Sequence, residues 1–322
     1  MPDGAPTQGA NREAGARRLV IWRFSDGKPG HDNQSLGLAE AIAGEVKCEI
    51  HSLKPMGPAM ALMHLVTGGA FANEPYSDPD LILGAGHTTH LSMLAARRSR
   101  GGRAIVSMTP TLPKKLFDLC LIPEHDRPGN GGNVIVTRGA LNRVRPCADK
   151  DAFSGLILLG GPSPHFAFDQ QKIIAQIQAV LKDDPVVVWT ATTSRRTPSE
   201  LAASLRALGS ANLNVVPVEE TTPGWLAGRL GRTERVWVTE DSASMMYEAL
   251  SGGAAVGLLT LEGKRPGRIS RGVEQLEKTG QVTRFDKWLK GSALKPSDAP
   301  LNEAVRCARL ILDRFPGISQ RR

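Results

Sequence analysis

The segment of this chain best suited to chemistry lies near its C-terminal end, at residues 235–250. It reads RVWVTEDSASMMYEAL: an apolar run, a polar turn, and then residues that favour a helix. A helix that begins where a parallel strand ends presents unpaired N–H groups and a positive dipole end, which attract phosphate. Asp241 or Ser242 can cap this helix, and Ser242 and Ser244 can offer hydroxyls to an anion. Glu248 follows Ser244 by one turn on the same face, where it can accept two hydrogen bonds from a ribose.

An ordinary capped helix with no ligand explains that pattern equally well, but two other turns add to it. Residues 160–163 and 192–196 each follow a predicted strand. Arginine matches the geometry of phosphate, so Arg195 or Arg196 can neutralise a leaving diphosphate. The three turns together predict a nucleotide-sugar site. Its residues are Gly161, Ser163, Thr193, Ser194, Arg195, Arg196, Glu240, Asp241, Ser242, Ser244, Met245 and Glu248.

A glycine-rich loop at residues 25–31 is the main candidate for acid–base chemistry. It follows a predicted strand and contains Asp26, Lys28, Gly30 and His31. Glycine lets a backbone approach a ligand closely, and histidine can take a proton near neutral pH. His31 is therefore a candidate catalytic base and Asp26 its competitor. A helix-capping loop with a solvated histidine is the alternative interpretation.

Two further loops of the first half are candidates for the cleft or for contact with an acceptor. Residues 84–87 contain His87 after a pair of glycines, and residues 123–126 contain Glu124 and His125. A polar transition from strand to loop is the alternative for the second of them. Residues adjacent in sequence do not converge easily on one ion, so we expect no metal site.

Strands that alternate with helices predict parallel, doubly wound sheets in two halves of the chain. In the first half we expect strands at 19–24, 48–53, 81–83, 104–108, 119–123 and 134–136, and helices near 33–43, 56–71 and 88–97. In the second half we expect strands at 156–159, 186–189 and 215–218, and helices near 169–181, 199–208, 222–229 and 304–315.

These elements divide the chain into four parts. Residues 1–18 form a disordered N-terminal tail, residues 19–150 the first domain and residues 151–300 the second, with a hinge between 147 and 154. Residues 301–322 form a C-terminal helix that can return to the first domain. The tail lacks the apolar core of a secretion signal.

Composition narrows the possible functions. The 322 residues carry a net charge of +8, which indicates an anionic partner or simply serves solubility. Aromatic residues make up only 5% and no nucleic-acid-binding motif is present, so we expect no nucleic-acid partner. The four cysteines are scattered and no apolar run is long enough to span a membrane, which favours a cytoplasmic location. The Walker pattern and a G-x-G-x-x-G after the first strand are both absent, which disfavours P-loop ATP hydrolysis and dehydrogenase activity.

Several motifs, taken in order, resemble those of the ELM (elongated mitochondria) fission-factor family. They are SDGKPGHDNQ at 25–34, PEHD at 123–126, GGPS at 160–163, TSRRTP at 193–198 and TEDSASM at 239–245. The resemblance extends from residue 19 to about residue 315. Such proteins resemble GT-B glycosyltransferases, in which two Rossmann-like domains face each other across a cleft.

The resemblance implies a glycosyltransferase that uses a nucleotide-diphosphate sugar as donor and needs no cofactor. The second domain would hold the donor and the first the acceptor. Similar loops in the peptidoglycan glucosaminyltransferase carry a histidine, which favours His31 as base. The wider fold group suggests a UDP-sugar, and an envelope or lipid-linked glycan is a candidate acceptor.

Two other functions remain open. A nucleotide-sugar 2-epimerase shares this fold and needs no acceptor, and a non-catalytic, membrane-associated scaffold would bind lipid instead. Residues 56–66 are apolar and can lie on the inner face of the membrane as a peripheral contact, although a buried core helix is the favoured interpretation.

Overall fold

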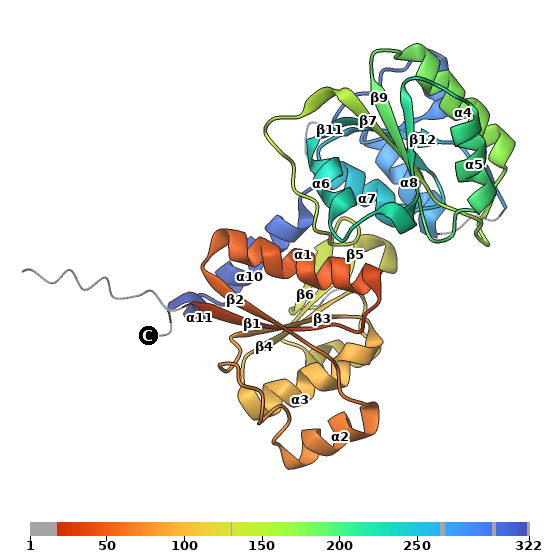
Figure 1. Ribbon diagram of the computed structural model, residues 1–322. Coiled ribbons are helices and arrows are strands. Elements are labelled where there is room, and N and C mark those ends of the chain that lie inside the picture. Colours follow the sequence, from red (N-terminus) through yellow and green to blue (C-terminus); the bar gives the residue numbers. More distant parts are fainter. Residues whose placement is uncertain (1–17, 130, 265–267, 298–300, 321–322) are drawn as a thin grey trace, which may run out of the picture.

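Two lobes, each built around a parallel six-stranded sheet, make up this computed structural model (Figure 1). The structure describes residues 18–129, 131–264, 268–297 and 301–320. The first sheet has the strand order β2-β1-β3-β4-β5-β6 and the second β10-β9-β7-β11-β12-β14. Both sheets are doubly wound. From the first strand of each sheet, β1 or β7, the chain adds strands on one side and then crosses back to add the remaining strands on the other side.

The first lobe contains the elements from β1 to β6. They are β1 (Leu19–Phe24), α1 (Pro29–Glu45), β2 (Cys48–Leu53), α2 (Pro58–Thr67), β3 (Leu81–Ala85), α3 (His90–Arg100), β4 (Arg103–Ser107), β5 (Leu119–Pro123) and β6 (Val134–Thr137). Short 3-10 turns at His87–Thr89, Lys114–Leu116 and Glu124–Asp126 complete its loops.

The second lobe contains the elements from β7 to α9. They are β7 (Asp151–Leu159), β8 (Phe166–Ala167), α4 (Gln170–Asp183), β9 (Val188–Thr193), α5 (Ser199–Ala207), β10 (Leu213–Val216), α6 (Trp225–Arg232), β11 (Thr233–Thr239), α7 (Ala243–Ser251), β12 (Ala255–Leu259), β13 (Glu262–Gly263), α8 (Arg268–Lys278), β14 (Thr283–Arg284) and α9 (Phe285–Leu289). Strands β8 and β13 pair antiparallel, outside the main sheet.

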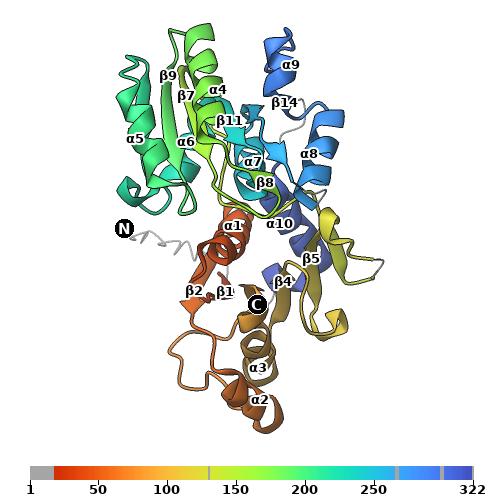
Figure 2. The ribbon, with the colours of Figure 1, turned by 90° about the vertical axis from the view of Figure 1, so that its right-hand side faces the viewer.

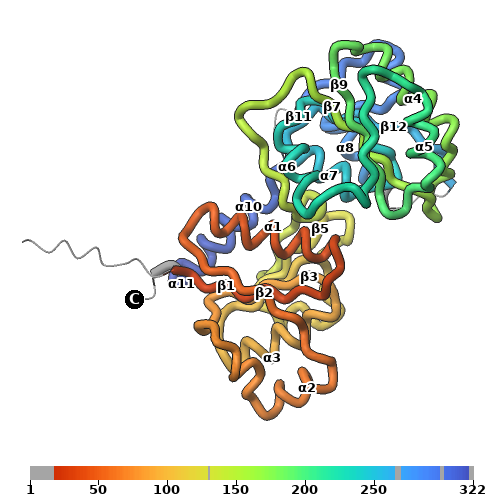
Figure 3. Tube along the Cα trace, in the orientation of Figure 1, coloured from red at the N-terminus to blue at the C-terminus, as the bar shows by residue number. Residues whose placement is uncertain are grey.

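The chain returns to the first lobe at its end. Helix α10 (Glu303–Arg314) packs against α1, and α11 (Gly317–Gln320) follows it. Cys307, Ala308 and Ile311 are fully buried in the same cluster as Leu38 of α1. Figure 2 and the trace in Figure 3 show this C-terminal segment beside α1.

Helices cover both faces of each sheet, which is why strands such as β3, β5 and β12 read as continuous apolar runs. All six residues of β1 are buried, and Trp22, Trp189 and Trp237 are almost fully covered. Since the apolar pattern is a local property of the sequence, β1, β2 and β5 have the bounds that were predicted.

Two helices differ from the predictions. Helix α1 begins at Pro29 rather than near residue 33, because proline at the first helical position fits the helix without losing a hydrogen bond. Helix α2 was expected in the core, but Ala61 is its one buried residue. Met60, Leu62, Met63 and Val66 are 52–76% exposed. In the part of the chain that the structure describes, no helix is long and apolar enough to cross a bilayer.

Candidate functional site

A cavity of about 750 Å³, here called the donor cavity, lies between the lobes. Its walls include Gly30 and Asn33 from the start of α1, together with Arg195 from the loop after β9. The start of α7 completes it with Ser242, Ser244, Met245 and Glu248. Figure 1 shows α1 facing the lobe that contains α6 and α7. Ligands of open α/β sheets bind beyond the carboxyl ends of the strands, and this cavity lies there in both lobes.

The first turn of α7 is suited to bind an anion. Ser242 occupies the N-cap position, but its side chain makes no capping hydrogen bond. The sequence predicted a cap from Asp241 or Ser242, and the structure turns the Asp241 side chain elsewhere. The first N–H groups of a helix have no partner within it, so this end of α7 can donate them to phosphate.

Asp241 instead braces the loops beneath α7. Its fully buried carboxylate accepts a hydrogen bond from the backbone N–H of Gly161 at 3.0 Å and pairs with Arg196 at 2.8 Å. Gly160 is required here, because a Cβ at that position would lie 2.2 Å from an Asp241 oxygen. The Arg196 guanidinium also donates to the carbonyls of Gly161 and Pro162. Asp241 therefore engages Arg196, whereas the neighbouring Arg195 lines the donor cavity.

Three hydroxyl groups predicted for the site also make local contacts. Thr193 Oγ1 accepts from the Val218 N–H at 3.0 Å, and Ser194 Oγ accepts from the Arg196 N–H at 3.2 Å. Ser163 Oγ accepts from the Phe166 N–H at 3.2 Å. These contacts shape the turns, and none of the three residues lines the donor cavity.

Glu240 is buried beside the site rather than within it. Burial raises the pKa of its carboxyl to about 7, although Arg284 lies 2.7 Å away and favours the charged form. This ion pair ties the end of β11 to β14.

Glu248 is contacted from the opposite lobe. Asn33 Nδ2 donates to its Oε1 at 2.6 Å, and burial raises the pKa of the Glu248 carboxyl to about 7. Asn33 also accepts from the N–H of Arg143 at 3.3 Å. Sequence reasoning did not select Asn33, because an asparagine near the start of a helix is ordinary. The contact joins residues 215 positions apart.

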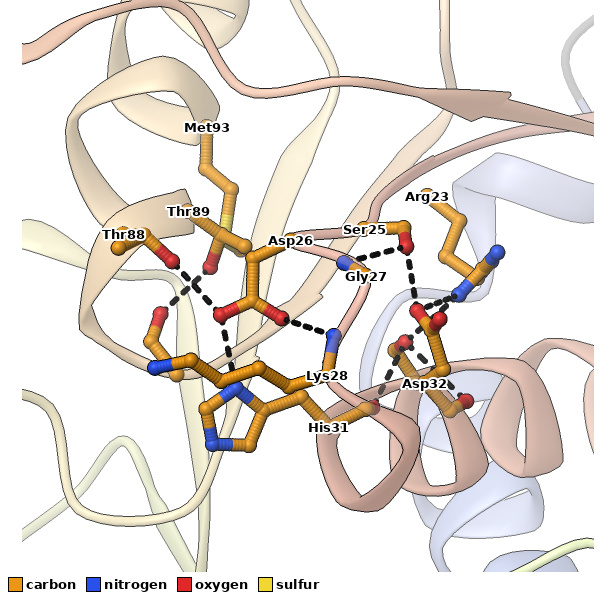
Figure 4. Close-up of polar contacts among 12 residues, drawn as sticks. Arg23, Ser25, Asp26, Gly27, Lys28, His31, Asp32, Thr88, Thr89 and Met93 are labelled. Carbon is orange, nitrogen blue, oxygen red and sulfur yellow. Dashed lines mark hydrogen bonds and ion pairs between the residues drawn. The ribbon is translucent and has the colours of Figure 1, made fainter.

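Asp26 and His31 form a hydrogen-bonded pair in the first lobe (Figure 4). Asp26 Oδ2 lies 2.9 Å from His31 Nδ1 and accepts from Thr88 Oγ1 at 2.8 Å. Burial alone would raise the pKa of Asp26, but the hydrogen bonds from His31, Thr88 and the Lys28 backbone outweigh it and lower that pKa. The ionised carboxylate favours a proton on Nδ1, which leaves Nε2 of His31 to accept one.

A buried arginine holds this loop in place. Arg23 of β1 lies 2.9 Å from Asp32 in the first turn of α1 (Figure 4). Its guanidinium also donates to Ser35 and Ser52. Gly86 has a φ of +84°, and a Cβ there would lie 2.3 Å from the His31 ring. The His31 ring is thus held between the loops that follow β1 and β3.

The remaining predicted residues of the first lobe lie apart from the donor cavity. His31 precedes Gln34 by one turn of α1, and Gln34 lines both the donor cavity and a smaller middle cavity of about 280 Å³. His125 also lines the middle cavity. Glu124 lines a third space, of about 830 Å³. Lys28 and His87 line neither the donor nor the middle cavity.

No group of three or more metal-binding side chains gathers at one point among the residues with described positions.

The fold and this cleft place the molecule in the GT-B class, with two Rossmann-like domains facing each other. Residues 29–315 match the family described as mitochondrial fission ELM1. The match spans most of the chain, and the protein belongs to that family.

Solved structures share the fold at low sequence identity. A Listeria monocytogenes protein described as a candidate UDP-N-acetylglucosamine 2-epimerase is 12% identical with a TM-score of 0.57, over 94% of this chain and 98% of that one. The UDP-GlcNAc 2-epimerase of Methanocaldococcus jannaschii is 11% identical with a TM-score of 0.56, over 92% and 100%. No curated protein matches the chain.

Proposed function

We propose that this protein is a glycosyltransferase that moves a sugar from a nucleotide diphosphate to an acceptor. The observation that carries the proposal is the division of the cleft. The donor cavity adjoins the middle cavity, and both have Gln34 and Ser244 in their walls. The middle cavity opens in turn into a third space of about 830 Å³. A second substrate therefore has room of its own beside the donor.

In this proposal the second lobe holds the donor. The free N–H groups of α7 and the Arg195 guanidinium bind the diphosphate, and Ser242, Ser244 and Met245 lie against it. Glu248 accepts hydrogen bonds from the ribose in place of Asn33. UDP is the proposed nucleotide, because the two fold relatives are named for UDP-N-acetylglucosamine.

The Asp26–His31 pair supplies the base. His31 Nε2 takes the proton of an acceptor hydroxyl, whose oxygen attacks the anomeric carbon of the sugar. The bond from that carbon to the diphosphate breaks, and Arg195 with the start of α7 stabilises the departing charge. Asp26 stabilises the imidazolium that results. This scheme uses no metal or other cofactor.

The proposed acceptor is an envelope or lipid-linked glycan, met by a cytoplasmic protein at the inner face of the membrane. The exposed apolar side chains of α2 support this part of the proposal, because an apolar helix face can rest on a lipid surface.

A nucleotide-sugar 2-epimerase is the second candidate, and the names of the two fold relatives favour it. Such an enzyme would change the sugar of its nucleotide without any acceptor. Incubation with UDP-sugars alone separates the two functions. An epimer formed without acceptor would reject the transferase.

Thermal unfolding with UDP, GDP, ADP, CDP and their sugars tests the donor site, because a ligand that binds the native state raises Tm. We expect one nucleotide series to raise Tm, and Arg195→Ala to reduce that shift. In turnover assays His31→Ala should keep the shift but lose activity by about 100-fold or more. No shift with any nucleotide would contradict the donor site and favour a non-catalytic scaffold.

A further inference from the structure

The third space of the cleft is a groove of about 830 Å³ lined by four cationic side chains, here called the basic groove. Arg127 and Arg138 come from the first lobe, and Arg271 and Lys295 from the second. All four side chains are exposed. Each lobe therefore contributes two positive charges to one space.

These four cations outnumber the counter-charges that the described parts of the chain bring to the groove. None of the four forms an ion pair with a residue of described position, and Glu124 is the one carboxylate that such residues bring to the groove walls. Like charges that face each other repel over distances up to roughly 8 Å at physiological salt. An anion bound between the four cations would relieve this repulsion and form favourable electrostatic interactions with all four.

The groove is continuous with the proposed site of transfer. His125, Tyr247, Gly272 and Leu276 line both the basic groove and the middle cavity. The middle cavity in turn reaches Gln34, one turn of α1 from His31. A molecule anchored in the basic groove can thus extend toward the proposed base.

The chemistry of the walls favours phosphate over other anions. Three of the four cations are arginines, whose planar forks match phosphate oxygens in pairs. Gln275, Thr279 and Gln281 add polar groups, and burial raises the pKa of Tyr247 to about 12, so its hydroxyl stays a donor. Tyr247 is the sole aromatic ring of the described lining besides His125, which argues against stacked nucleobases.

We propose that the basic groove binds a phosphate or diphosphate group of the acceptor, at a second anion site separate from the nucleotide. The inference rests on the proposed transferase function, since it names the class of acceptor that the enzyme uses. A lipid diphosphate and a soluble sugar phosphate share this chemistry.

Calorimetric titration of inorganic pyrophosphate into protein saturated with UDP tests the groove. We expect a further binding site in the native protein, weakened at least tenfold in the Arg138→Glu/Arg271→Glu variant. UDP affinity should be unchanged in that variant. The control is Arg98→Glu/Lys182→Glu, which makes the same charge change at exposed cations outside the groove and should retain both sites.

The milder Arg138→Gln/Arg271→Gln pair guards against misfolding and should weaken pyrophosphate binding by a smaller factor. Geranyl diphosphate and N-acetylglucosamine 1-phosphate then identify the source: tighter binding of the first indicates a lipid-linked acceptor, and of the second a soluble one. Absence of pyrophosphate binding, or equal loss in the control pair, would overturn the proposal. UDP titration reports on the donor site by itself, so failure of that site is seen separately.

Discussion

Two carboxyl groups of the cleft have pKa values that their surroundings move in opposite directions. Burial raises the pKa of Glu248 to about 7, whereas hydrogen bonds lower that of Asp26 despite its burial. Near neutral pH Asp26 is ionised, which suits a partner for His31, and Glu248 is partly protonated. Opposed pKa values of this kind are typical of sites where two acids have different roles.

The raised pKa of Glu248 makes stability depend on pH. The native state keeps the Glu248 proton at pH values where the unfolded chain, with a pKa near 4.5, has lost it. The free energy of unfolding therefore falls as pH rises from about 4.5 to about 7. Glu248→Gln does not titrate, so its stability relative to the native protein should rise over this range, by at most about 3 kcal/mol.

Urea unfolding of both proteins at pH 4.5 and pH 8 measures this difference. Glu219→Gln, at an exposed position, is the control and should change stability equally at both pH values. An equal effect of Glu248→Gln at the two pH values would mean that the Glu248 carboxyl has an ordinary pKa.

At the scale of elements, α2 differs from every other apolar helix that the structure describes. It carries no Asp, Glu, Lys or Arg, yet only one of its ten residues, Ala61, is buried. It lies with α3 at the end of the first lobe remote from the second lobe (Figures 1 and 2). Its apolar face thus points to solvent, at a distance from the cleft.

We predict that α2 attaches the protein to lipid bilayers. Full burial of a leucine or valine side chain is worth about 1.5–3 kcal/mol, so Leu62→Ser/Val66→Ser should reduce partition into vesicles at least about tenfold. Co-sedimentation with vesicles of phosphatidylethanolamine and phosphatidylglycerol measures it. Phe153→Ser/Val186→Ser removes apolar groups of 66% and 67% exposure from the other lobe and should leave partition unchanged. Equal partition of both variants would contradict a lipid-binding role of α2.

At the scale of the whole molecule, polar contacts tie the two lobes together on one side of the cleft. The segment after β6 is fixed to α1, since Arg143 pairs with Glu40 at 2.6 Å. Asn142 of the same segment donates to Ser251 at the end of α7 at 2.9 Å. Asn33 and Glu248 make the contact across the donor cavity itself.

A ribose that donates hydrogen bonds to the Glu248 carboxylate must displace the Asn33 side chain from it. Above its pKa of about 7 Glu248 is charged, and hydrogen bonds to charged groups are worth about 1.5–3 kcal/mol. At pH 8 Asn33→Ala should therefore tighten nucleotide binding by roughly 10-fold or more. Calorimetry with UDP measures this affinity, and Asn73→Ala at an exposed position of the same lobe is the control. Weaker binding in Asn33→Ala would show that Asn33 holds the closed, liganded state instead.

The order of strands and helices follows from the sequence because hydrophobic periodicity is local. The runs at 19–24, 48–53 and 119–123 could be read without knowledge of their neighbours, and each is a strand. The position of α7 after β11, with Ser242 at its start and Glu248 one turn beyond Ser244, follows from the same local pattern.

Only the tertiary structure decided which side chains meet. It paired Arg196 with Asp241 and left Arg195 to the cavity, a choice that two adjacent arginines do not reveal. It placed Asn33 against Glu248 and exposed the face of α2. It also brought four scattered cations to one groove. Such contacts depend on how segments far apart in the sequence pack against each other. A local pattern of neighbouring residues contains no information about that packing.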